Sequence, residues 1–418
     1  MREDRTGPER IGANGSWSME ADKKTQPTLV VIDDEPDLCE FVAEVAKLEG
    51  FDPIAISDAP SIAAIVGADP EVIVLDLNMP DMDGVEILRR CAERGCRARF
   101  ILMSGFDRKV LDAACQLAVA HRLTVAGILE KPVRGADLQE LLRKQVSAPS
   151  RRKGPPAVTV AEISRAIEQG ELVLHYQPQV ELATGEWVGV EALVRWQHPA
   201  HGLLYPDAFV EMAERNGYAL ALTRRVLETA VREWPAVGTP LGFTGTVAVN
   251  LPPSALSDVA FPEEVIRIAG SLGVESNRLQ FELTETSVAA DPVVALDILA
   301  RLRLKGFRLS VDDFGTGHAS LEQLQTLPFN ELKIDVNFVR AAETDPRARV
   351  ITEKSVALGK ELGLTVLAEG IEIENLWHWL RKQGCDRGQG YFIGRPVPAA
   401  AMPAWMEAWR ERRKALVA

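Results

Sequence analysis

The segment Arg308-Leu-Ser-Val-Asp-Asp-Phe-Gly-Thr-Gly317 carries the pattern that decides the fold of the larger part of the chain. A short apolar run ends in two carboxylates, and a glycine turn follows them. Such a run predicts a buried strand, and polar residues at its carboxyl end predict a site at the edge of a parallel sheet. The same pattern recurs on both sides of this segment.

Strand candidates with helical stretches between most of them fill the second part of the chain. About eight strand–helix units in about 260 residues is the size of a (β/α)8 barrel. The first two candidates follow one another directly across Ala183-Thr184-Gly185, so we expect an irregular first strand. The predicted strands are 171–178, 188–196, 243–250, 279–283, 308–311, 331–334, 365–368 and 390–393.

Shorter apolar runs, each followed by a helical stretch, occupy the first part of the chain. This alternation predicts a doubly wound, flavodoxin-like parallel sheet with helices on both faces. The whole chain is therefore expected to belong to the α/β class. The runs are 29–32, 53–56, 72–75, 100–103 and 125–129.

Composition sets the limits of the domains and excludes some functions. We expect a disordered segment at 1–26 (with Met1 or Met19 as the true start), the sheet domain at 27–146, a linker rich in proline and basic residues at 147–157, and the barrel at 158–418.

The net charge of −13 over 418 residues argues against a DNA partner. No apolar stretch predicts a membrane span. Five scattered cysteines favour a cytoplasmic location.

Polar residues follow the strands of the first domain at one edge of its sheet. Asp33 and Asp34 follow the first strand, Asp76 ends the third, Ser104 follows the fourth and Lys131 follows the fifth. Three carboxylates at one edge predict a Mg²⁺ site. A carboxylate beside Mg²⁺ can accept a phosphoryl group, and a lysine and a hydroxyl can hold its oxygens.

A larger set of oxygen ligands follows the barrel strands. So many carboxylates in one cleft cannot stay ionised without cations, and ligands without cysteine or histidine favour Mg²⁺ or Mn²⁺. The number suits two metal ions, with Asp312 as a bridge, and predicts phosphodiester hydrolysis. Lys333 is expected to orient or deprotonate the attacking water, or to offset charge on the phosphate. The predicted ligands are Glu191, Asn250, Glu282, Asp312, Asp313 and Glu369.

Residues 28–146 resemble the receiver domain of bacterial two-component response regulators, through VVIDDE, VLDLNMPDMDG, MSG and EKP. The resemblance implies that Asp76 is the phosphoacceptor, that a sensor histidine kinase is the phosphodonor, and that the remaining pocket residues hold one Mg²⁺ or sense the phosphoryl group. These residues are Asp33 and Asp34 for the metal, and Ser104 and Lys131 for the phosphoryl group. Ile128 stands where such domains often carry Tyr or Phe, which leaves the usual switch open.

Residues 158–410 resemble the EAL domain of cyclic-di-GMP phosphodiesterases, through YQP, EALVRW, VNL, ELTET, DDFGTG, LKID, AEGIE and GQGYFIGRP. The resemblance implies the product pGpG and a role for each motif residue. Glu191, Asn250, Glu282 and Asp312 hold one metal; Asp312, Asp313 and Glu369 hold the second; Lys333 and Glu369 assist the water; Gln177, Leu193 and Arg195 contact the dinucleotide; Gln389 lies beside the active site; Glu285 and Glu372 support the loop that starts at Asp312.

Two functions remain open on the sequence. The first is phosphorylation-regulated hydrolysis of cyclic-di-GMP, with Glu191, Lys333 and Glu369 as the catalytic group. The alternative is a catalytically inactive sensor that binds cyclic-di-GMP and acts through protein contacts. Both resemblances imply a homo-oligomer, a dimer or larger.

Overall fold

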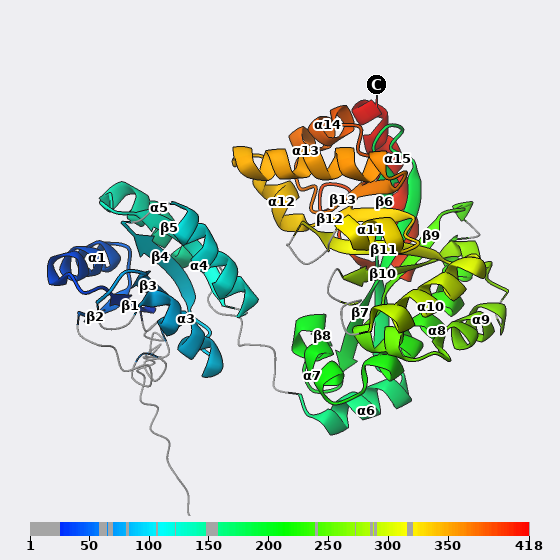
Figure 1. Ribbon diagram of the computed structural model, residues 1–418, viewed down its shortest axis with the longest axis horizontal. Helices are drawn as coiled ribbons and strands as arrows, with labels where there is room; N and C mark the ends of the chain where they lie inside the picture. The colour runs from blue at the N-terminus through cyan, green and yellow to red at the C-terminus, as the bar shows by residue number, and fades with distance from the viewer. Residues whose placement is uncertain are drawn as a thin grey trace, which may run out of the picture. The chain divides into compact units, whose positions relative to one another are not determined.

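A computed structural model describes the protein at residues 26–57, 65, 70–80, 83–105, 108–121, 123–147, 158–238, 241–271, 273–284, 287, 291–315 and 321–417. The chain divides into two compact units, Met1–Lys153 and Gly154–Ala418, and each is described by itself (Figure 1). Most of the predicted N-terminal segment and linker, residues 1–25 and 148–157, lies outside the described residues. The predicted domain limits therefore stay a prediction.

The first unit is a five-stranded parallel sheet with the order β2-β1-β3-β4-β5, which is the flavodoxin-like order. Alternate residues of β1 pack on opposite faces: Val30 and Ile32 join the apolar cluster with α3 and α4, and Leu29 and Val31 join the cluster with α1 and α5. The predicted doubly wound fold is confirmed. The elements are β1 Thr28–Ile32, α1 Pro36–Leu48, β2 Asp52–Ile56, β3 Val72–Asp76, α3 Gly84–Glu93, β4 Arg99–Ser104, α4 Arg108–Ala120, β5 Thr124–Glu130 and α5 Gly135–Ser147.

The second unit is a closed barrel (Figure 1). Strand β6 pairs antiparallel with both β7 and β14, and the remaining barrel pairs are parallel. The predicted (β/α)8 barrel is confirmed, and the reversed β6 is the irregular first strand. The barrel strands are β6 Leu172–Glu181, β7 Trp187–His198, β9 Thr246–Asn250, β10 Leu279–Thr284, β11 Arg308–Phe314, β12 Glu331–Ile334, β13 Thr365–Ala368 and β14 Arg387–Gln389; β8 Gly202–Leu204 and β15 Val397–Pro398 pair outside the barrel.

The last barrel strand lies earlier in the sequence than predicted. We predicted 390–393, whereas β14 is Arg387–Gln389. Gly390 begins a turn, because its carbonyl accepts hydrogen bonds from the backbone N–H groups of Ile393 and Gly394. A Cβ atom on Gly390 would lie 2.2 Å from the carbonyl oxygen of Ile371, so only glycine fits this approach.

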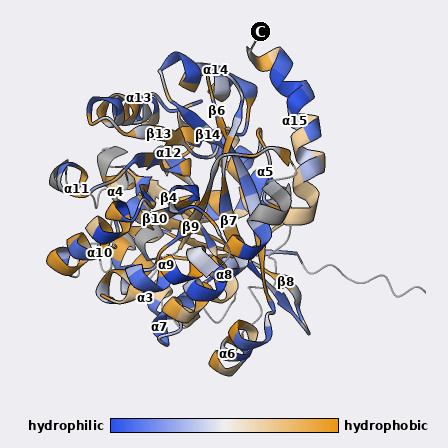
Figure 2. Ribbon diagram, turned by 90° about the vertical axis from the view of Figure 1, so that its right-hand side faces the viewer, coloured by the Kyte–Doolittle hydropathy of each residue, from blue (hydrophilic) through white to orange (hydrophobic). Residues whose placement is uncertain are grey.

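Helices surround the strands of the barrel, and the last of them, α15, covers one side of it. In α15 the start of the helix is the more hydrophobic part, and a hydrophilic stretch follows it before the apolar Leu416 and Val417 at the end (Figure 2). Trp405 and Trp409 anchor this helix by donating hydrogen bonds to the carbonyls of Ile393 and Gly185. No helix within the described ranges is long and apolar enough to cross a membrane. The helices are α6 Val160–Gln169, α7 Val210–Arg215, α8 Ala219–Gly238, α9 Phe261–Ser271, α10 Pro292–Leu304, α11 Leu321–Thr326, α12 Val336–Ala341, α13 Pro346–Glu361, α14 Glu374–Lys382 and α15 Met402–Val417.

Substitution Gly245→Ala is expected to destabilise the barrel by about 2 kcal/mol, because the new Cβ meets backbone that cannot move aside. Gly245 precedes β9, and its Cβ would lie 2.0 Å from the carbonyl oxygen of Val188. The control is Gly270→Ala in α9, where a Cβ meets nothing within 4 Å and alanine favours the helix. Urea unfolding followed by tryptophan fluorescence measures both variants. Equal stability of the two variants would contradict the prediction.

Candidate active site

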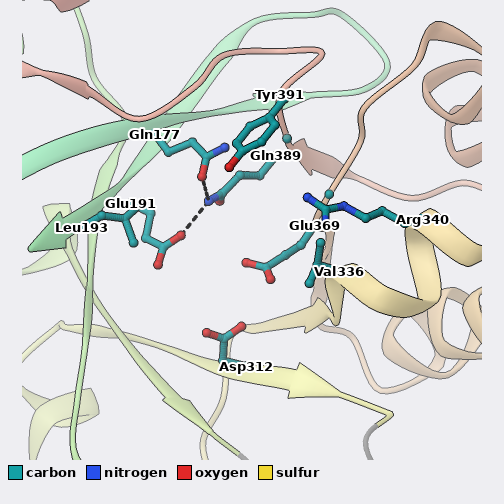
Figure 3. A pocket seen from close by; sticks show the side chains of 11 residues that line it. Gln177, Glu191, Leu193, Asp312, Val336, Arg340, Glu369, Gln389 and Tyr391 are labelled. Atoms are coloured by element: carbon teal, nitrogen blue, oxygen red, sulfur yellow. Dashed lines mark hydrogen bonds between the residues drawn. The ribbon is translucent and has the colours of Figure 1, made fainter. Parts of the chain in front are cut away.

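The carboxyl ends of neighbouring barrel strands bring the predicted oxygen ligands together. Glu282 of β10 lies in register with Asn250, the last residue of β9, and Thr284 lies in register with Asp312 of β11. The side chains of Glu191, Asp312 and Glu369 face a common pocket of 220 Å³ (Figure 3). The strand-end prediction therefore identified residues that share one mouth of the barrel.

Lys333 of β12 lies at the centre of these carboxylates and is fully buried. Its Nζ atom is 2.8 Å from Glu282 Oε2, 3.1 Å from Asp312 Oδ1 and 2.8 Å from Glu369 Oε1, and Glu191 Oε2 lies 4.0 Å away. Burial alone would lower the pKa of this amine, but the surrounding carboxylates outweigh burial and hold the pKa well above its usual value. One ammonium group faces four carboxyl groups, so the site keeps an excess of negative charge.

Burial, together with the excess negative charge, raises the pKa of Glu369, Asp313 and Glu282. Burial, followed by the charges of Asp312 and Glu191, raises the pKa of Glu369 to about 8, although Lys333 opposes this shift. Burial and the charge of Asp312 raise the pKa of Asp313 to about 7. Burial also raises the pKa of Glu282 well above its usual value. Metal cations can replace these protons, because carboxyl groups lose their protons when they bind a metal.

The donor atoms fit hard divalent cations. Oxygen atoms of Asp312, Asp313 and Glu369 all lie within 4.8 Å of one another. Glu282 Oε1 is buried and has no hydrogen-bond partner among the described residues, as expected of an oxygen that takes a metal. Asp313 holds a left-handed backbone with φ 56°, which aspartate tolerates better than most residues. Oxygen donors of this kind suit Mg²⁺ or Mn²⁺.

A chain of glutamine side chains orients Glu191. Gln389 Nε2 donates to Glu191 Oε2 at 2.6 Å and to Gln177 Oε1 at 3.0 Å (Figure 3). Gln179 Nε2 donates to Gln389 Oε1 at 2.9 Å, and Asn250 Nδ2 donates to Glu191 Oε1 at 2.9 Å. Glu191 is therefore fixed from both sides. Sequence reasoning missed Gln179, although its place two residues after Gln177 on the same strand face was the available signal.

The predicted substrate contacts are only partly brought together. Gln177 and Leu193 line the pocket, whereas the described lining does not include Arg195. Arg195 lies over the ring of Tyr205 at 4.9 Å, and its Nη1 atom donates to the carbonyl of Val194. A second cavity of 460 Å³ adjoins Leu193 and Asn250.

The structure describes one of the two residues that were predicted to support the loop starting at Asp312. Glu372 forms an ion pair of 2.6 Å with Arg340 of α12, and Glu285 lies outside the described residues. Arg340 and Tyr391 line the pocket but were not predicted (Figure 3). Tyr391 stands inside the GQGYFIGRP segment that the sequence had already singled out. Arg340 lies in α12, the helix that follows the strand of Lys333, and carries no comparable signal.

The first unit has its own aspartate pocket at the carboxyl ends of β1 and β3. Asp33 and Asp76 are buried, and Lys131 Nζ lies 2.9 Å from an oxygen of each. Oxygens of Asp33, Asp34 and Asp76 lie within 4.8 Å of one another, a spacing that suits one divalent cation. Ser104 is buried at the end of β4. The structure therefore places all five predicted pocket residues at one sheet edge.

Ile128 of β5 lies in register with Leu102 of β4 and packs against the apolar cluster shared with α3 and α4.

Fold and site together define a class of protein. Proteins of this class carry a doubly wound domain with an aspartate pocket and an α/β barrel. In the barrel, oxygen ligands surround a buried lysine.

The family follows from comparison with known proteins. Residues 160–396 match the EAL domain, and residues 29–143 match the response regulator receiver domain. The chain therefore belongs to the EAL family and carries a receiver domain before its EAL domain.

Individual relatives agree with this assignment. The chain is 30% identical to the cyclic di-GMP phosphodiesterase RocR of Pseudomonas aeruginosa, over 88% of this chain and 96% of RocR. It is 37% identical to an uncharacterized signaling protein of Caulobacter vibrioides, over 84% of this chain but only 43% of that protein. The solved structure of the MucR phosphodiesterase of Pseudomonas aeruginosa with c-di-GMP covers 58% of this chain and 98% of that chain, at 37% identity and a TM-score of 0.55.

Binding of Mn²⁺ to the barrel is expected to release protons at low pH and none at high pH. Asp313 and Glu369, with pKa values of about 7 and about 8, hold protons below those values and must lose them to bind a cation. Apparent affinity should therefore rise with pH and level off above about pH 8. Calorimetry in buffers of different ionisation enthalpy counts the protons. The Asp34→Asn variant serves as the background, because it weakens the receiver pocket.

Asp313→Asn in the same background is the matched control for this measurement. It should release fewer protons at about pH 6, since one titrating carboxyl is gone. A proton release that does not change with pH would contradict the assignment.

Proposed function

We propose that this protein hydrolyses cyclic-di-GMP to linear pGpG by a two-metal mechanism and that phosphorylation of its receiver domain regulates the reaction. The observation that carries the proposal is the buried Lys333 within 3.1 Å of three carboxylates, beside an oxygen-only cluster at the barrel mouth. The names of RocR and MucR as phosphodiesterases support the same reaction.

The residues divide into two ligand sets that share one bridge. Glu191, Asn250, Glu282 and Asp312 would hold the first metal, and Asp312, Asp313 and Glu369 would hold the second. When bound, Mg²⁺ or Mn²⁺ ions supply an acidic water and neutralise charge that develops on the phosphate. Gln389 holds the orientation of Glu191, which would be a ligand of the first metal, through the 2.6 Å hydrogen bond. The substrate would lie along the pocket side formed by Gln177 and Leu193, and Arg195 would be a further contact from outside the described lining.

Lys333 and Glu369 take different parts in handling protons. Because the carboxylates hold the pKa of Lys333 well above its usual value, this side chain stays charged and orients water or a phosphate oxygen. The pKa of Glu369 is raised to about 8, so its carboxyl holds a proton near neutral pH until a cation displaces it. The carboxylate that metal binding leaves would then be the proton acceptor for the water. Among the roles that the sequence left open for Lys333, the proposal therefore assigns it the orienting role and not deprotonation of the water.

The receiver domain is the regulatory part of the proposal. A sensor histidine kinase would transfer a phosphoryl group from its phosphohistidine to an oxygen of Asp76, so that a P–N bond breaks and a P–O bond forms. Lys131 lies 2.9 Å from Asp76 Oδ2, and Ser104 is buried at the end of the neighbouring strand. Both would hold phosphoryl oxygens, beside one Mg²⁺ that Asp33 and Asp34 would bind. Assembly into a homo-oligomer belongs to the same proposal.

Glu191→Gln is expected to lower the turnover of cyclic-di-GMP by about 100-fold, because the first metal loses a charged ligand. Glu186→Gln is the matched control, since Glu186 is exposed on the same barrel. Chromatography of pGpG formed with Mg²⁺ or Mn²⁺ measures both variants. Wild-type protein that binds cyclic-di-GMP but never forms pGpG would instead support the inactive sensor.

Asp76→Asn is expected to keep the basal turnover and to lose any change that a small-molecule phosphodonor causes in the wild-type protein, because the acceptor carboxylate is gone. Asp52→Asn, an exposed position on β2, controls for a simple change in charge. Turnover with and without the donor is the measurement. An Asp76→Asn protein that still responds to the donor would refute Asp76 as the acceptor.

A further inference from the structure

A further pocket, of 520 Å³ and distinct from the two described above, lies at the opposite mouth of the barrel. The proposed catalytic residues stand at the carboxyl ends of the strands, whereas this pocket is built from strand starts. Its lining includes the first residues of four barrel strands and the turn that precedes β10. These residues are Trp187, Thr246, Arg308 and Arg387, together with Asn277 and Arg278.

The arginines of the pocket carry more positive charge than the neighbouring buried carboxylate of Glu331 can balance. Glu331, which is fully buried, accepts a 2.7 Å hydrogen bond from Arg387 on Oε2. Its other oxygen accepts from Gln280 at 2.6 Å and from Ser310 at 3.4 Å. The hydrogen-bonding capacity of this carboxylate is therefore committed to Arg387 and its neighbours.

Arg308 is a half-buried guanidinium group without a carboxylate partner in the described part of the chain. Its one hydrogen bond there runs from Nε to Gln280 Oε1 at 3.3 Å, which leaves its outer nitrogens to the pocket. Burial lowers the pKa of Arg308, and the neighbouring positive charges of Arg387 and Arg303 lower it further, although Glu331 opposes this. A desolvated cation beside other cations is unfavourable unless an anion joins it.

Two further side chains indicate that a ligand binds in this pocket. Arg278 lies 3.6 Å from the exposed Glu275, a distance too long for a strong ion pair. Thr246 is 7% exposed, and its buried hydroxyl oxygen has no hydrogen-bond partner among the described residues. Glu186, the carboxylate in the described lining of the pocket, is exposed to solvent and balances little of this charge.

We propose that this pocket binds the phosphate group of a phosphorylated small molecule. Guanidinium forks match phosphate oxygens with paired hydrogen bonds, and Arg308 and Arg278 bring two of them to one cavity. The cavity has the volume of an ordinary small-molecule site, so it has room for a nucleotide as well as for free phosphate. This site is separate from the carboxylate mouth and does not depend on the hydrolysis proposed there.

Calorimetric titration of the full-length, metal-free protein tests the proposal, with inorganic phosphate, GMP and guanosine as probes. Without metal ions the two acidic pockets repel anions, so binding there does not obscure the result. Wild-type protein should bind one phosphate or one GMP per chain, and guanosine should not bind. Tighter binding of GMP than of phosphate identifies a nucleotide site, and equal affinity identifies a site for the phosphate group alone.

Three variants locate the site. Arg308→Gln should weaken phosphate binding by about tenfold or more, and Arg278→Gln should weaken it by several-fold. Arg267→Gln is the control, because this exposed arginine of α9 is outside the pocket lining. Arg278→Gln also keeps the test valid if Arg308→Gln fails to fold. Absence of saturable binding to wild-type protein, unchanged binding in the two pocket variants, or an equal loss in Arg267→Gln would overturn the proposal.

Discussion

The rest of the barrel site depends on one interaction, the buried ammonium group of Lys333 among carboxylates. Its contacts of 2.8 to 3.1 Å to three acids reach across β10, β11 and the end of β13. A charge buried this deeply is tolerated only with close partners, and the acids in turn cannot gather without it. The lysine therefore sets the spacing of the strand ends, and the remaining negative charge creates the demand for cations.

The reversed strand β6 adds a second constraint. Because β6 pairs antiparallel with both β7 and β14, it brings Gln177 and Gln179 to Gln389. The resulting hydrogen bonds end on Glu191, a residue in the middle of β7. A regular parallel first strand would present its carboxyl end instead. The irregularity of the barrel is thus the means by which one metal ligand is oriented from inside the protein.

Both domains place a lysine against carboxylates at the carboxyl ends of parallel strands, but they bury it to different degrees. Lys131 keeps 16% of its side chain exposed, whereas Lys333 is fully buried. The partly exposed Lys131 would leave the aspartate pocket open to an incoming phosphoryl donor. The buried Lys333 leaves a fixed charge, shielded from water, that acts on whatever binds above it. In the proposed function, the same strand-end geometry therefore serves covalent transfer in one domain and preorganised electrostatics in the other.

The sequence by itself determined both folds and the carboxylates at the strand ends, because apolar period and strand spacing are local properties of the chain. Asp312 and Glu369 were predictable for this reason, whereas Glu191, in the middle of β7, was found through its Glu-Ala-Leu motif. Tertiary structure alone decided the place of β14, the contact of Gln179 with Gln389, the ion pair of Arg340 with Glu372, and the contact of Arg308 with Gln280. Each of these depends on distances between segments far apart in sequence, and such distances are fixed only when the barrel closes and its side chains pack.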